Sequence, residues 1–320
     1  MIIDKQLRKR RYEYDELIPS GGKAVNKNEG EIYAGKVIIP DNEVSGVIKS
    51  LLQSDGSKMI ARFGANELKA MISGLCDDYP CHLWERHKRN VEHDGLFSGA
   101  GVFPRNVNLI PSFAQIMKDA CKEVDLLGVW FNRYEDMVIQ ELCDSEIKLC
   151  SLKMLAPQYD PKHPWTECLT GRKVLVVHPF VDSMRKQYEK RDLLFENKNM
   201  LPDMDLHFLK AVQSSAGQKN PMFKNWFDAL EYMYEETQKF DYEIAIIGCG
   251  AYGFPLASMM KRDGKKVLHL GGTTQLLFGI IGQRWLDNPN EKIKINDAWI
   301  HPSMEETPRN FHKVEGGCYW

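Results

Sequence analysis

The sequence predicts an α/β protein with a Rossmann-like, mainly parallel sheet and helices on both faces of that sheet. Short aliphatic and β-branched runs at 58–61, 174–177, 244–247 and 267–270 are typical of strands that are buried on both sides. Segments with apolar residues at helical spacing separate these runs, so strands and helices alternate along the chain. The stretch 241–272 is the clearest case, because it reads as strand, glycine turn, helix and second strand, which is a complete βαβ unit.

The first half of the chain follows this plan after an N-terminal arm at 1–40, within which 35–40 reads as a short strand or an extended segment. We expect residues 41–320 to form a single α/β domain, which can be divided into halves 41–165 and 166–320. The predicted elements of the first half are a helix at 42–52, a strand at 58–61, helices at 65–72 and 113–124, a strand at 125–131, a helix at 137–142 and a strand at 147–152.

The second half continues the alternation and ends in an aromatic segment. Because buried Tyr and Trp rings contribute strongly to stability, we expect the segment 313–320 to pack back over the functional site. The predicted elements are a strand at 174–177, a helix at 184–195, a strand within 201–210, a helix at 226–239, a strand at 244–247, a helix at 252–262, a strand at 267–270 and a helix within 275–282.

Composition excludes several classes of protein. A formal net charge of −2 gives no electrostatic case for nucleic acid as a partner. The chain has no apolar run near the roughly 20 residues of a membrane span and no signal-like start, so we expect a cytoplasmic protein. The basic cluster 5–11 is compatible with peripheral contact to an anionic membrane surface, although a solvated segment is the commoner meaning of so short a run.

Cysteine and histidine spacing indicates no resident zinc. The eight cysteines include no C-x-x-C pair, so we expect reduced thiols. His82, His87 and His93 are five and six residues apart, which does not place them on one helical face. We therefore expect surface or loop histidines there and no metal set.

The glycine turn Gly248-x-Gly250-x-x-Gly253, which also contains Tyr252, is the pattern by which backbone N–H groups at a helix start approach a phosphate. A nicotinamide-binding unit would place an acid near the end of the second strand to hold the ribose, whereas this chain has His269 there. We therefore favour a phosphate-bearing ligand other than NAD. Two alternatives stay open: an NAD(P)-dependent oxidoreductase, and a turn whose glycines serve only its tight geometry.

A second polar cluster follows the strand at 58–61. Arg62, Asn66 and Glu67 flank Gly64 where this strand ends and a helix begins, which is where open α/β sheets bind ligands. A glutamate there can hold a divalent metal or act as a base, and an arginine can clamp an anion. The alternative is that Asn66 and Glu67 only cap the helix and favour its dipole.

His178 follows a strand in the same way and is a candidate base, because imidazole titrates near neutral pH. A histidine in front of a proline also often hydrogen-bonds the loop backbone. Both readings of His178 are compatible with the sequence.

Three motifs resemble one family. Arg62-Phe-Gly-Ala-Asn-Glu67 resembles the R-F-G-D-G-E segment of glycosyltransferases of the GT-D fold, whose D-x-E element binds a nucleotide-sugar with a divalent metal. Residues 171–177 resemble the W-x-G-K strand of that family with the Trp displaced. Residues 245–257 and 264–271 resemble its L-G-P-x-A-x-x-L-A and G-x-x-x-x-D-I-G-H sections, so the resemblance spans 58–285 in patches.

The resemblance implies a glycosyltransferase that moves a sugar from a nucleotide-diphosphate sugar to a glycan or lipid-linked acceptor, in polysaccharide biosynthesis. Glu67 would carry over as the acid that organises the diphosphate or the metal. Ala65 replaces the first acid of the family, which puts dependence on Mn or Mg in doubt, and His269 replaces a later Asp. A non-catalytic nucleotide-sugar-binding relative is therefore a further alternative.

The candidate site combines these clusters. It requires the strand tips near 62–67 and 248–253 to face one shared crevice. We expect Glu67 and His178 to be catalytic and Glu67 to be the metal ligand. The expected substrate-binding residues are Arg62, Gly64, Asn66, Gly248, Gly250, Tyr252, Gly253, His269, Gln275 and Arg284.

Overall fold

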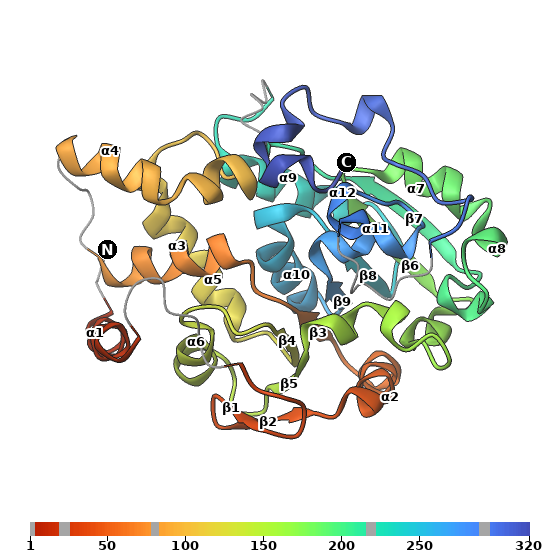
Figure 1. Ribbon diagram of the computed structural model, residues 1–320, viewed down its shortest axis with the longest axis horizontal. Helices are drawn as coiled ribbons and strands as arrows, with labels where there is room; N and C mark the ends of the chain where they lie inside the picture. Colours follow the sequence, from red (N-terminus) through yellow and green to blue (C-terminus); the bar gives the residue numbers. More distant parts are fainter. Residues whose placement is uncertain (1–3, 19–25, 78–82, 216–221, 288–294) are drawn as a thin grey trace.

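The computed structural model describes residues 4–18, 26–77, 83–215, 222–287 and 295–320 (Figure 1). It contains a nine-stranded sheet in the order β1-β2-β5-β4-β3-β9-β8-β6-β7. All of its pairings are parallel except that of β1 with β2. The predicted α/β class with a mainly parallel sheet is confirmed. The strands are β1 Ile32–Tyr33, β2 Lys36–Ile39, β3 Lys58–Ala61, β4 Leu126–Val129, β5 Lys148–Ser151, β6 Lys173–His178, β7 Asp205–Lys210, β8 Ile244–Ile247 and β9 Lys266–His269.

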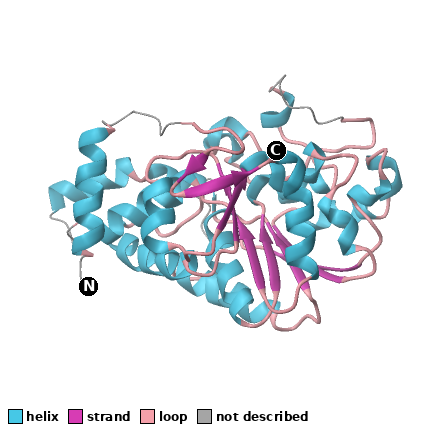
Figure 2. Cartoon of the chain, turned by 90° about the horizontal axis from the view of Figure 1, so that it is seen from below, coloured by secondary structure: helices cyan, strands magenta, loops and turns pink. Residues whose placement is uncertain are grey.

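Helices cover both faces of the sheet, as predicted. Consecutive strand residues alternate between two apolar cores, so that Met59 and Ala61 join one core and Ile60 joins the other. Figure 1 shows α10 and α2 on opposite sides of β3, and Figure 2 shows the strands running between helices. The α-helices are α1 Lys5–Leu17, α2 Asp41–Gln53, α3 Ala65–Cys76, α4 Leu83–Glu92, α5 Ile110–Cys121, α6 Glu135–Leu142, α7 Val181–Tyr188, α8 Arg191–Leu194, α9 Trp226–Thr237, α10 Gly253–Arg262, α11 Thr274–Leu277 and α12 Gln283–Leu286.

Strand order determines where a ligand can bind. From β3 the first half of the chain builds outward through β4 and β5, whereas β6 to β9 lie on the other side of β3. The two halves meet where β3 pairs with β9. In open parallel sheets the crevice at such a switch point, beyond the carboxyl ends of the strands, is the usual ligand site.

The first 40 residues, expected as an arm, contribute a helix and two strands to the molecule. Helix α1 begins at Asp4, whose carboxylate accepts a hydrogen bond from Leu7 N–H and pairs with Lys118 on α5 at 2.8 Å. Strand β2 pairs in parallel with β5, in the register Ile38 to Leu149. No described helix combines the length and the apolar character that crossing a bilayer requires.

Several expectations need correction. Helices α1 and α4 were not predicted: α1 buries only Leu7, and α4 is a short segment rich in charged residues whose Val91 is 60% exposed. The helix expected at 184–195 is two helices, α7 and α8. The helix expected within 275–282 ends at Leu277, two residues before Gly279, which has a φ of +61°. His93, expected as a surface or loop histidine, lies in the turn that follows α4 but is only 2% exposed; His82 lies outside the described residues.

Candidate functional site

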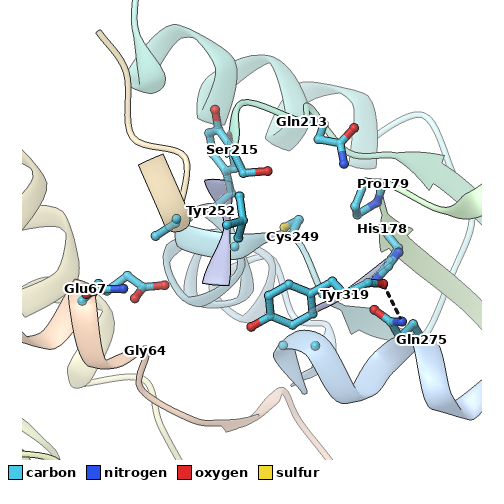
Figure 3. Close-up of a pocket in the computed structure, with 18 of the residues that line it drawn as sticks. Gly64, Glu67, His178, Pro179, Gln213, Ser215, Cys249, Tyr252, Gln275 and Tyr319 are labelled. Atoms are coloured by element: carbon cyan, nitrogen blue, oxygen red, sulfur yellow. Dashed lines mark hydrogen bonds between the residues drawn. The ribbon is translucent and has the colours of Figure 1, made fainter. Parts of the chain in front are cut away.

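One pocket opens at the carboxyl ends of β3, β6, β8 and β9, at the meeting point of the two halves of the sheet (Figure 3). Glu67 and Gly250, which lie about 180 residues apart in the chain, both line it. The shared crevice predicted from the sequence is therefore present. Of the predicted site residues, those lining the pocket are Arg62, Gly64, Asn66, Glu67, His178, Gly248, Gly250, Tyr252, His269, Gln275 and Arg284, whereas Gly253 is not among them.

Two arginines bring positive charge to the pocket. Arg62 follows β3, and its guanidinium lies over the Trp130 ring, with 4.9 Å between Cζ and the ring centroid. Desolvation lowers the pKa of Arg62, the charge of Glu67 raises it and the charge of Arg284 lowers it. Arg284 donates a hydrogen bond from Nη1 to the Tyr319 hydroxyl at 2.9 Å. Both guanidinium groups are therefore held in place by aromatic neighbours.

Glu67 lies in the first turn of α3, and Figure 3 shows its side chain directed into the pocket from the side opposite His178. Its carboxylate folds back against Gly64, since a Cβ on Gly64 would lie 2.0 Å from Oε2. This placement gives Glu67 a favourable position beside the helix N-terminus and also exposes it to a ligand. Asn66 points elsewhere, because its amide packs against Gly95. Glu67 has the one acidic side chain among the described residues that line the pocket.

Glu135 supports Trp130, which lines the pocket, and was not among the predicted site residues. Its carboxylate is fully buried and accepts hydrogen bonds from the N–H groups of Trp130 at 3.2 Å and Phe131 at 2.7 Å. Burial raises the pKa of Glu135 to about 7, although these hydrogen bonds act in the opposite direction. Trp130 also donates from Nε1 to Phe63 O at 3.0 Å, which orients the ring under Arg62. The run of polar residues at 132–135, directly after β4, is the feature of the sequence that could have indicated Glu135.

His178 does not fit the role of general base that the sequence suggested. Its side chain is 3% exposed, and Nδ1 accepts a hydrogen bond from Phe180 N–H at 3.0 Å. A neutral ring that accepts at Nδ1 carries its proton on Nε2, so it can donate a hydrogen bond but has no free basic nitrogen. Burial lowers the pKa of His178 to about 3. The alternative reading, a histidine that bonds the loop backbone, is the one that the structure supports.

The glycine turn packs against the rest of the protein. A Cβ on Gly248 would lie 2.6 Å from Gly271 O, and one on Gly250 would lie 2.8 Å from Ala100 O. Ala251 N–H already donates to Ala100 O at 3.0 Å. The turn is therefore partly covered by the 99–101 loop and is a poorer phosphate cradle than its spacing suggested.

The third glycine of the turn makes room for a histidine ring. A Cβ on Gly253 would lie 2.4 Å from two ring atoms of His269, which is 3% exposed. His269 thus fills the space at the end of β9 where a nicotinamide site would need an acid for the ribose. This arrangement disfavours the NAD(P) alternative.

We predict that Gly253→Ala lowers the free energy of unfolding by roughly 1–3 kcal/mol, because the added methyl group overpacks against His269. The Gly253→Ala/His269→Ala double variant should lose less stability than the sum of the two single variants, as measured by urea unfolding. Unchanged stability of Gly253→Ala together with weaker nucleotide binding would instead support a phosphate-binding role for this glycine.

The polar side-chain atoms of Gln275 and Tyr252, which we expected to bind substrate, form hydrogen bonds within the protein. Gln275 Nε2 donates to Tyr319 O at 3.1 Å and to Ile280 O at 3.3 Å. The Tyr252 hydroxyl lies 2.8 Å from Ser214 Oγ, which in turn donates to a backbone carbonyl of the 99–101 loop. These residues therefore position the pocket wall.

The aromatic segment at the end of the chain packs back over the pocket, as predicted. Tyr319 and Trp320 both line it. Arg284 N–H donates to Cys318 O at 2.9 Å, and Trp320 Nε1 donates to Glu306 O at 3.4 Å. This packing was predicted, whereas Tyr319 and Trp320 were not among the predicted site residues.

The residues around Glu67 do not fit Mn or Mg. Such ions take oxygen ligands, usually one or two carboxylates together with substrate phosphates and waters. The described part of the chain contains no group of three or more His, Cys, Asp or Glu residues that could hold a metal ion. Ala65 stands where the related motif has its first acid, and Asn66 packs against Gly95. A divalent ion at Glu67 would also meet the positive charge of Arg62.

Comparison with known proteins gives structural neighbours only. No family model matches the chain. No curated protein matches it either. A solved structure described as "The highly conserved domain of unknown function 1792 has a distinct glycosyltransferase fold" is similar at a TM-score of 0.47 and 13% identity, covering 85% of this chain and 93% of that one.

A second solved structure, described as a new glycosyltransferase of the same domain family from Streptococcus sanguinis, is similar at a TM-score of 0.43 and 10% identity. It covers 85% of this chain and 96% of that chain. Both descriptions name glycosyltransferases.

Proposed function

We propose that this protein is a glycosyltransferase that transfers a sugar from a nucleotide-diphosphate sugar to a glycan or lipid-linked acceptor in polysaccharide biosynthesis. The observation that carries the proposal is that Arg62 and Glu67 both line one pocket, at the switch point of the sheet. An enzyme of this class has to neutralise a leaving diphosphate and deprotonate an acceptor hydroxyl. The pocket offers a cation for the first task and a carboxylate for the second.

The proposed reaction uses residues of the chain for each step. The bond between the anomeric carbon and the diphosphate oxygen breaks, and the electron pair leaves with the diphosphate beside Arg62. The acceptor oxygen bonds to the sugar carbon, and its proton passes to a carboxylate oxygen of Glu67. His178, as a neutral donor at Nε2, can hydrogen-bond an oxygen of either substrate.

A panel of UDP- and GDP-sugars tests the proposal with the purified full chain, and a CMP-sugar, which carries one phosphate and no diphosphate, is the contrast. We expect one nucleotide class to raise the melting temperature, because a ligand that binds only the native state stabilises it in proportion to occupancy. The matching nucleotide-sugar should then release its nucleotide when an acceptor is supplied. Binding without release or transfer from any donor would favour a non-catalytic nucleotide-sugar-binding protein, and failure of the whole panel to bind would contradict the proposal.

A further inference from the structure

The charge balance of the pocket is unusual for a site that would hold a divalent cation. Among the side chains of the described residues that line it, two carry a guanidinium group, those of Arg62 and Arg284, and one carries a carboxylate, that of Glu67. Oxygen ligands for a hard cation are scarce there, whereas donors for an anion are abundant. The pocket is therefore better suited to a polyanion than to a metal ion.

Arg62 and Arg284 reach this pocket from distant parts of the chain. Arg62 follows β3 in the first half of the sheet, and Arg284 lies in α12 of the second half. Burial is the main cause that lowers the pKa of Arg62, and the charge of Arg284 lowers it further, so the two charges interact. Two like charges that face one cavity repel each other in the free protein, and a bound anion between them would relieve that repulsion.

Each guanidinium contacts an aromatic residue of the pocket, although Arg284 itself is exposed. The Arg62 group stacks over Trp130, which Glu135 and Phe63 hold from below. Arg284 bonds the Tyr319 hydroxyl, and its Cζ lies 5.6 Å from the centroid of that ring. Planar guanidinium groups match phosphate oxygens in a bidentate fork, so preorganised arginines bind phosphates strongly.

We infer that Arg62 and Arg284 together bind the diphosphate of the nucleotide-sugar and neutralise its charge as it leaves, in place of a divalent cation. This inference rests on the proposed function. The two guanidinium groups supply a formal charge of +2, which equals that of the Mn or Mg ion they replace. The segment 318–320 then serves the site by positioning Arg284.

Titration calorimetry with UDP and GDP tests the inference, using the full chain in EDTA and again with MnCl2 or MgCl2. We expect the same nucleotide to bind in EDTA and in metal, with affinities within about twofold of each other. Arg284→Ala should weaken binding about tenfold or more in EDTA, as loss of a charge-assisted hydrogen bond predicts. Arg284→Lys should recover only part of the affinity, because a lysine cannot form the bidentate fork.

Arg172→Ala is the matched control, since it removes the same charge from the amino end of β6, where Arg172 pairs with Glu243. It should bind as the unmodified protein does. Binding that requires the metal, or an Arg284→Ala affinity equal to that of the control, would overturn the inference while leaving the proposed function intact. No binding of either nucleotide under any condition would contradict the proposed function itself.

Discussion

Glu67→Gln is expected to lower the rate of sugar transfer by about 10²- to 10⁴-fold, the usual contribution of a general base. Glutamine keeps the shape of the side chain against Gly64 but cannot take up the proton of the acceptor hydroxyl. The variant loses the interaction of a carboxylate with the start of α3, which is worth about 0.3–1 kcal/mol, and the attraction of that carboxylate to Arg62. The melting temperature should therefore change little, and kcat measured beside a thermal unfolding curve checks both parts.

Glu43→Gln is the matched control for this experiment. Glu43 lies in the first turn of α2, so its substitution removes a carboxylate from an equivalent position on a helix that does not line the pocket. It should leave transfer unchanged. Full activity in Glu67→Gln would remove Glu67 from the mechanism.

The His178→Asn variant tests which of the two predicted catalytic residues, Glu67 or His178, acts as the base. The asparagine oxygen can replace Nδ1 as the acceptor for Phe180 N–H. Since the pKa of His178 is about 3, the ring stays neutral across the working pH range, and its removal should leave the limbs of the kcat/KM profile where they were. A limb near pH 6.5 that disappears in His178→Asn would restore the histidine as the base.

The sheet was predictable because each buried strand is a local apolar run that carries its own signal. The residues 244–247 and 58–61 are examples, and both were placed correctly by pattern alone. The βαβ spacing also placed the glycine turn at the carboxyl end of β8. Helix α1 was missed because it buries only Leu7, so no apolar periodicity marks it. Helix α4 was missed because most of its residues are charged or polar.

The site was only partly predictable, because its chemistry depends on contacts between distant segments. Arg62, Glu67 and Gly250 were found from their place at strand ends. The state of His178 depends on a hydrogen bond and on burial that composition does not reveal. The glycine spacing predicted that a phosphate could approach the backbone. In the structure, the space beside Gly250 and Gly253 is occupied by Ala100 and His269. A local sequence pattern cannot distinguish a glycine that leaves room for a ligand from one that leaves room for another part of the protein.

Glu306 shows how far such contacts reach. The Glu306 side chain is 1% exposed. It contacts the start of α7, a helix that lies about 120 residues before Glu306 in the chain. The carboxylate accepts hydrogen bonds from Asp182 N–H at 2.8 Å, from Ser183 N–H at 3.2 Å and from the Ser183 hydroxyl. It also takes part in a capping box with Ser303. A negative charge at a helix N-terminus with several donors around it is strongly stabilised.

Glu306→Ala should therefore lower the free energy of unfolding by roughly 2–4 kcal/mol, because buried donors at the start of α7 lose their acceptor. Glu305→Ala is the control, since it removes the same group from the exposed neighbouring residue and should change urea unfolding little. Nucleotide binding should weaken as well, because the backbone of Glu306 accepts hydrogen bonds from Gln213 and Trp320 in the pocket wall. If Glu306→Ala does not fold, Glu306→Gln should give an intermediate loss of unfolding free energy. Equal stability of Glu305→Ala and Glu306→Ala would show that the buried carboxylate of Glu306 does not hold its segment to the start of α7.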